Sequence, residues 1–118
     1  MKLHNFIAAI FSSHFMIGST MAETTCTITE KFQCAQGQGC QSVKNTIVVR
    51  IDIDRQAYSR CDANGCDERQ GQFSISGEFI NIALPENGLL AKLIRDGSHF
   101  TEVATLGTNV LLSFGSCN

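Results

Sequence analysis

The sequence predicts an all-β domain, an antiparallel meander of about eight short strands, closed as a small barrel or folded as a two-sheet sandwich and stapled by disulfides. Apolar and polar residues alternate with a period of two in most segments after residue 24, and turn-forming residues separate these segments. Only residues 89–94 pass as helical, and this window is too short for a stable helix. Six cysteines, an even number in a short chain, indicate three disulfides.

The clearest strand covers residues 47–53, where isoleucine or valine at 47, 49, 51 and 53 forms one face and the charged residues Arg50, Asp52 and Asp54 form the other. The turn after residue 84 contains Pro85, the only proline, and Asp96-Gly97 is a favoured hairpin dipeptide. Short turns of this kind place consecutive strands side by side in the sheet. The remaining segments expected as strands are 25–33, 57–61, 73–76, 79–84, 89–95, 100–106 and 110–117.

The apolar faces of these strands predict a packed interior, because a barrel of about eight short strands leaves room for side chains or at most one small ligand. The residues expected inside are Ile28, Phe32, Val49, Ile51, Ile53, Phe73, Ile75, Ile80, Ile82, Leu93, Phe100, Val110, Leu112 and Phe114.

Residues 1–22 have the pattern of a secretory signal peptide. Lys2 precedes an apolar stretch over residues 6–17, and small residues lead to Ala22 before the charged Glu23. The apolar stretch is shorter than the roughly 20 residues that span a bilayer. An uncleaved anchor or a buried first helix is the alternative. From the signal-peptide pattern we expect a periplasmic or secreted protein. Residues 23–118 should form a single β domain that has no membrane attachment once the signal peptide is removed.

All six cysteines follow the predicted signal peptide, and sequence alone leaves 15 pairings open. Turn sequences between the partners favour the pairs Cys61–Cys66 and Cys34–Cys40, which leaves Cys26 with Cys117. The last pair requires a bulge, for example at Gly115, because Cys117 alternates out of phase with the apolar residues 110, 112 and 114. Redox or zinc chemistry is the alternative, but neither cysteine spacing matches a C-x-x-C motif.

The formal net charge of the chain is −2, with the two signs interspersed. Nucleic acids and anionic membranes attract strongly basic surfaces, so we expect neither as a partner. Tyr58 is the only tyrosine and tryptophan is missing, which leaves little aromatic surface for sugar stacking.

Catalysis has few candidate residues. His99 is the only histidine after the predicted signal peptide, and it follows the hairpin that contains Asp96. A small hydrolase or metal-dependent enzyme would need His99 together with nearby carboxylates. Asp62-Ala63-Asn64-Gly65 matches only the opening of a calcium loop. We expect no catalytic residue, no cofactor and no metal site.

A binding function requires fewer specific residues than catalysis, because loops on a rigid scaffold can present a surface to a partner. Loops are expected at 34–44, 61–70 and 85–88, and the most highly charged segment supplies the candidate partner-binding residues Arg60, Asp62, Asp67, Glu68 and Arg69. The leading hypothesis is a non-enzymatic binding domain whose partner is an envelope or extracellular protein. A solvated hairpin tip explains the same charges, and a structural envelope protein is a further alternative.

Three features of the sequence resemble an uncharacterised family of small exported, six-cysteine proteins of Gram-negative bacteria. They are Cys26-Thr27-Ile28, the segment Arg60-Cys61-Asp62 with Gly65-Cys66, and residues 79–82 followed by 100–107 and Cys117. The resemblance implies an exported domain and supplies no catalytic residue. Size, export and meander are more distantly similar to those of periplasmic lysozyme inhibitors, but the serine-glycine and lysine segments expected of these inhibitors are missing, so that likeness is architectural.

Overall fold

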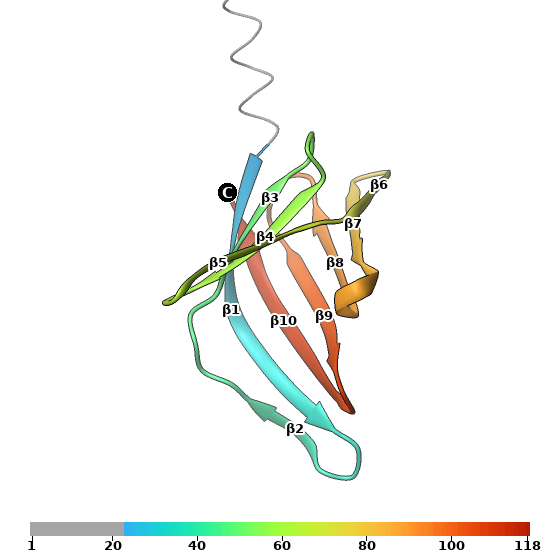
Figure 1. The fold of residues 1–118 in the computed structure, drawn as a ribbon. Coiled ribbons are helices and arrows are strands. Elements are labelled where there is room, and N and C mark those ends of the chain that lie inside the picture. Colours follow the sequence, from blue (N-terminus) through green and yellow to red (C-terminus); the bar gives the residue numbers. More distant parts are fainter. Residues whose placement is uncertain (1–22) are drawn as a thin grey trace, which may run out of the picture.

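The computed structural model describes residues 23–118, and the predicted signal peptide lies outside the described residues. The chain forms an all-β, antiparallel meander that closes into a nearly complete barrel (Figure 1), as predicted. Within the described residues, no helix is long and apolar enough to cross a membrane. The elements are β1 (Glu23–Ala35), β2 (Gly39–Ser42), β3 (Val48–Asp52), β4 (Ala57–Asp62), β5 (Gly65–Gln70), β6 (Gln72–Ser76), β7 (Phe79–Leu84), the 3-10 turn η1 (Pro85–Asn87), β8 (Leu89–Ile94), β9 (Phe100–Leu106) and β10 (Asn109–Cys117).

The strands follow one another around the barrel in the order β5-β4-β3-β1-β10-β9-β8-β7-β6, and β2 pairs with β1 outside this path. The first and last strands are therefore neighbours in the middle of the sheet. The two ends of the sheet, β5 and β6, are separated in sequence by Gly71 alone. We call the bent segment 65–76 the seam, because it passes from the β4 side of the barrel to the β7 side (Figure 1). The Gly71 N–H anchors the bend by donating to the carbonyl oxygen of Gln56.

Strands β2 and β5 occupy segments that the sequence predicted as loops. Both are returning arms of hairpins, and in each hairpin the two cysteines stand directly opposite one another in register. Gly37, Gly39 and Gly65 have positive φ, which allows the tight reversals. The loop predictions were wrong here, because polar sequences without an apolar face do not reveal strands that lie outside the core.

The three predicted disulfides are confirmed: Cys34–Cys40 joins β1 to β2, Cys61–Cys66 joins β4 to β5, and Cys26–Cys117 joins β1 to β10. We call the last of these the first-to-last disulfide, since its cysteines lie 91 positions apart. Such a long closed loop restricts the unfolded chain most, and the chain-entropy model gives about 4–5 kcal/mol of stabilisation. Three disulfides in so short a chain indicate an oxidising compartment.

The interior agrees only in part with the predicted core. Of the predicted set, Ile28, Val49, Ile51, Ile80, Ile82, Leu93 and Phe100 are buried, and Ile53 and Phe73 pack against them. Ile75 is 56 % exposed, at the free edge of the sheet. The buried residues that the prediction missed are Cys26, Ile47, Ala57, Tyr58, Leu84, Leu89, Ala91 and Ala104, with the polar Lys31, Ser59, Glu102 and Ser113.

The face of β10 that points into the barrel is the opposite of the predicted one. Ser113 is 1 % exposed, whereas Phe114 is 38 % exposed. Cys117 shares the inward parity of Ser113, so it reaches Cys26 without a bulge in β10. The irregularity lies in the partner strand: Ile28 pairs with Gly115 and Glu30 with Phe114, which leaves Thr29 without a partner.

The bulge at Thr29 changes which side of β1 faces inward. Ile28 is buried before it and Lys31 after it, so Phe32 points to the outer face. Gly115 permits the close approach of the two strands, because a Cβ atom there would clash with the carbonyl oxygen of Thr27.

Candidate functional site

An ion pair between a buried carboxylate and a half-buried arginine spans the interior of the barrel. Glu102 on β9 is 2 % exposed and accepts two hydrogen bonds from Arg60 on β4, from Nε at 3.0 Å and from Nη2 at 2.9 Å. The hydroxyl of Tyr58 donates a third at 2.5 Å. Burial, and then the neighbouring Glu102 charge, raise the pKa of Tyr58 well above its ordinary value, so the phenol stays protonated. The two hydrogen bonds to Glu102 fix the orientation of the Arg60 guanidinium group.

Two further polar residues lie inside the barrel next to Glu102. Ser113 on β10 is directly opposite Glu102 on one side and Lys31 on the other. Among the described residues, the buried Ser113 Oγ has no hydrogen-bond partner. Lys31 Nζ donates to Asn45 Oδ1 at 3.4 Å. Burial, and then the charge of Arg60, lower the pKa of Lys31.

A cavity of about 250 Å³ opens between β5 and the η1 turn, and we call it the barrel mouth. Tyr58 and Arg60 lie on its β4 side, and Asp67 and Arg69 come from β5, which pairs with β4. Its other walls are mostly apolar and comprise Leu84, Asn87, Leu89, Ala104, Leu106 and Leu111. The arrangement is an apolar chamber with charged groups along one side, which is typical of pockets that hold small molecules.

The structure divides the candidate partner-binding residues between two faces. Arg60, Asp67 and Arg69 face the barrel mouth, and Arg69 Nη2 lies 3.2 Å from Asp67 Oδ2. Asp62 and Glu68 do not line the barrel mouth. Asp62 caps its own turn by accepting from the N–H of Asn64 at 2.8 Å.

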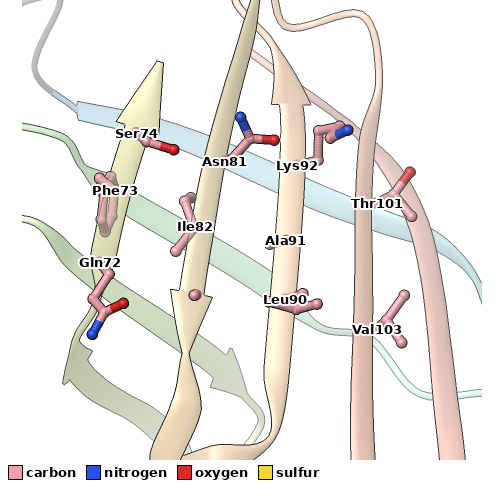
Figure 2. Close-up of a pocket in the computed structure, with 11 residues that line it drawn as sticks. Gln72, Phe73, Ser74, Asn81, Ile82, Leu90, Ala91, Lys92, Thr101 and Val103 are labelled. Atoms are coloured by element: carbon pink, nitrogen blue, oxygen red, sulfur yellow. The ribbon is translucent and has the colours of Figure 1, made fainter. Parts of the chain in front are cut away.

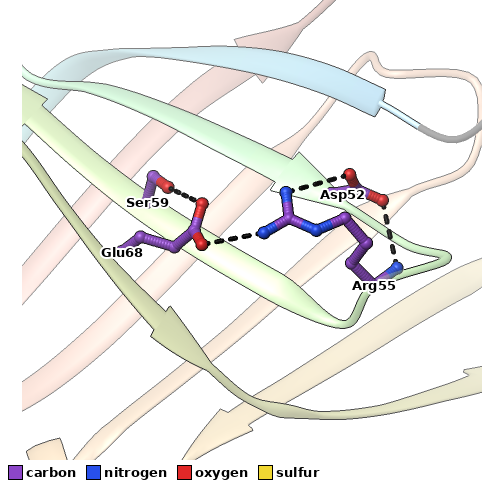
Figure 3. A network of polar contacts seen from close by, with 4 residues as sticks. All are labelled: Asp52, Arg55, Ser59 and Glu68. Carbon is purple, nitrogen blue, oxygen red and sulfur yellow. Dashed lines mark hydrogen bonds and ion pairs between the residues drawn. The ribbon is translucent and has the colours of Figure 1, made fainter.

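Glu68 belongs to a polar network on the outer face that ties β3, β4 and β5 together (Figure 3). Arg55 Nη2 donates to Glu68 Oε2 at 2.9 Å, and Ser59 Oγ donates to its other oxygen at 3.4 Å. Asp52 accepts from the backbone N–H of Arg55 at 3.1 Å. The charge of Glu68 is thus paired within the chain and has reduced capacity for a partner.

The outer face of the barrel carries a row of apolar side chains in register. Phe32 pairs with Leu112, Leu112 with Val103, Val103 with Leu90, and Leu90 with Ala83, across β1, β10, β9, β8 and β7. We call these five residues the outer apolar row.

Leu90 is 62 % exposed, and Figure 2 shows it beside Val103 on the neighbouring strand. The same view shows Asn81, Lys92 and Thr101 forming a parallel polar row. This polar row and three residues of the outer apolar row, Ala83, Leu90 and Val103, line a shallow depression. At the other end, the ring of Phe114 lies 6.4 Å from that of Phe32 in an edge-to-face arrangement.

His99 lies in the β8–β9 hairpin and is exposed. Its Nδ1 is 3.0 Å from Ser98 Oγ. Asp96 accepts from the backbone N–H of Ser98 at 2.8 Å, and hydrogen bonds from Ser98 lower the pKa of the Asp96 carboxyl. Within residues 23–118, no three His, Cys, Asp or Glu side chains are grouped to hold a metal ion.

Sequence reasoning missed both the buried ion pair and the outer apolar row. Glu102 lies 42 positions from Arg60, and no local pattern joins them. The alternation in 100–106 does place Glu102 on the same face as Phe100, which is the one local sign that it is buried. Neither a family model nor a curated protein matches this chain. Membership of the family of small exported six-cysteine proteins therefore stays a prediction.

Proposed function

We propose that the protein is an exported, non-enzymatic binding domain that docks a partner protein on its outer apolar row. The row itself is the observation that carries the proposal. Its five strands, spaced about 4.8 Å apart, give an apolar strip roughly 20 Å long. Leu90 is exposed and the other four residues are half-buried, so the row is a contiguous apolar strip at the surface. Contiguous apolar patches mark interaction sites more often than scattered apolar residues do.

The surroundings of the row support a protein partner. A protein interface has an apolar centre and a polar rim. Thr101, Lys92 and Asn81 supply such a rim along one side. The aromatic pair Phe32 and Phe114, at one end of the row, supplies a residue type that is enriched in interfaces. The Lys92 ammonium lies 5.0 Å from the centre of the Phe79 ring, which restricts its position before a partner arrives.

The charged segment of the β4–β5 hairpin is the weaker surface. Its ionic groups already have partners within the chain: Arg60 with Glu102, Arg69 with Asp67, and Glu68 with Arg55. A partner protein would have to compete with these contacts. By compartment, we place the partner in the periplasm or outside the cell, as an envelope or extracellular protein.

Site-specific photo-crosslinking tests the docking face. A photoreactive residue at position 90 should yield one discrete adduct with a second protein in intact producing cells. The matched control carries the same residue at position 75, because Ile75 is nearly as exposed as Leu90 but lies at the free edge of the sheet. Introducing Leu112→Glu alongside the probe at position 90 should abolish the adduct.

Equal adducts from positions 75 and 90, or no adduct from position 90, would refute the docking face. An adduct of twice the chain's mass that contains only this protein would identify the row as a self-association surface and overturn the proposed foreign partner.

A further inference from the structure

The barrel mouth lies apart from the outer apolar row and has the chemistry of a small-ligand site. We propose that it binds a small amphipathic carboxylate, with the apolar body inside the chamber and the carboxylate at the arginine side. This inference does not depend on the proposed function, because the two sites share no lining residue.

The size of the cavity sets the size of the ligand. An apolar cavity of about 150 Å³ takes up benzene, so the 250 Å³ here suits a body of about ten non-hydrogen atoms. Leu84, Leu89 and Ala104 are at most 8 % exposed and form a rigid apolar wall, whereas Leu106 is 57 % exposed at the entrance. A ligand therefore enters past Leu106 and loses its water shell against the deeper residues.

The hydrogen-bonding groups of the cavity select an acceptor. Glu102 already accepts three hydrogen bonds, so it has little capacity left for a ligand. Arginine has five N–H donors. Arg60 uses its Nε and Nη2 atoms for Glu102, and Arg69 uses Nη2 for Asp67, so the contacts among the described residues leave N–H groups of both arginines uncommitted.

The charges around the cavity are balanced, so the open N–H groups on its arginine side, rather than a net positive charge, favour an anion there. The cavity is lined by two guanidinium groups, Arg60 and Arg69, against one carboxylate, Asp67. Glu102 balances Arg60 from behind but cannot move toward solvent, because it is 2 % exposed. A carboxylate can accept from the uncommitted N–H groups of both arginines, whereas an amine would have to share Asp67, the only carboxylate in the cavity lining, with Arg69.

Isothermal titration calorimetry with 3-phenylpropionate tests the inference on the protein purified with its disulfides intact. The neutral probe 3-phenylpropan-1-ol has the same apolar body. We expect the acid to bind at least about tenfold more tightly than the alcohol, since one charge-assisted hydrogen bond corresponds to that factor or more. Arg69→Gln should weaken binding of the acid by about tenfold for the same reason.

Charge variants at the entrance provide matched controls, because the exposed Leu106 tolerates substitution. Leu106→Glu should weaken binding of the acid, and Leu106→Lys should leave it equal or stronger. Leu90→Glu, which disrupts the outer apolar row, should not change it. Equal binding of acid and alcohol, failure of the acid to bind, or equal effects of the two Leu106 variants would each overturn the inference.

Discussion

Replacing Arg60 with methionine tests whether Glu102 depends on that guanidinium inside the barrel. The variant keeps a long apolar side chain but removes two charge-assisted hydrogen bonds from a carboxylate that is 2 % exposed. Removing one partner of a buried ion pair costs about 3–5 kcal/mol, because the remaining charge stays desolvated. We expect a loss of this size in the free energy of unfolding for Arg60→Met.

Glu102→Gln perturbs the same pair from the other side and should cost less. The amide preserves an acceptor oxygen for Tyr58, and the side chain of Arg60, 29 % exposed beside the barrel mouth, can regain water. Loss of a hydrogen bond to a charged group then gives about 1–3 kcal/mol. The double variant Arg60→Met/Glu102→Gln has no unpaired buried charge, so it should be more stable than Arg60→Met alone.

Urea unfolding at neutral pH, monitored by circular dichroism with disulfides intact, measures all four members of this cycle. The decisive comparison is between Arg60→Met and the double variant. If adding Glu102→Gln to Arg60→Met lowers stability by as much as it does in the parent protein, the two residues are independent. The reasoning about a buried pair is then refuted.

Removing the first-to-last disulfide by alanine substitution should lower the free energy of unfolding by about 4–5 kcal/mol, against about 2 kcal/mol for the β4–β5 disulfide; equal shifts of the urea midpoint would contradict the loop-length argument. Gly115→Ala should prevent folding or lower the melting temperature severely, because the added Cβ meets the backbone of β1. Gly107 has φ 62° but open space around it, so Gly107→Ala should lower the free energy of unfolding by only about 1 kcal/mol. Similar melting temperatures of the two variants would rule out the predicted clash. The pKa of Tyr58 is raised in the folded protein, so its contribution to the free energy of unfolding is intact below pH 10 and is lost above it as the unfolded phenol ionises. The stability of Tyr58→Phe should therefore fall less steeply with rising alkaline pH than that of the parent protein. Identical stability–pH profiles of the two proteins would exclude this role.

The fold class and the disulfide pairing were predictable because their signals are local. Alternation in 47–53 identifies β3 without knowledge of its neighbours, and Asn64-Gly65 between two cysteines specifies a hairpin that brings them together. Assigning both local pairs left only Cys26 and Cys117. The same local reasoning failed for β10, where Val110, Leu112 and Phe114 are the more apolar face and yet point outward.

The orientation of β10 depends on contacts that sequence spacing does not express. On the inward face of β10, Ser113 stands between Lys31 and Glu102, which reach the interior from two other strands. Thr29 reverses the parity of β1 through a bulge that no glycine or proline in β1 announces. The candidate sites follow from these reversals, since they place Phe32 outside, where it joins Leu112 in the outer apolar row.

Because the sheet ends at the seam, its backbone amides fall into two groups that exchange with deuterium at different rates: those of the end strands and those of the central strands. Strands β5 and β6 each pair with one neighbour, so the N–H groups along their free edges exchange without any unfolding. The central strands β1 and β10 are paired on both sides and covalently joined at Cys26 and Cys117, so their amides exchange only when the whole barrel opens. Deuterium labelling therefore begins along the free edges of β5 and β6 and reaches the β1–β10 pair last.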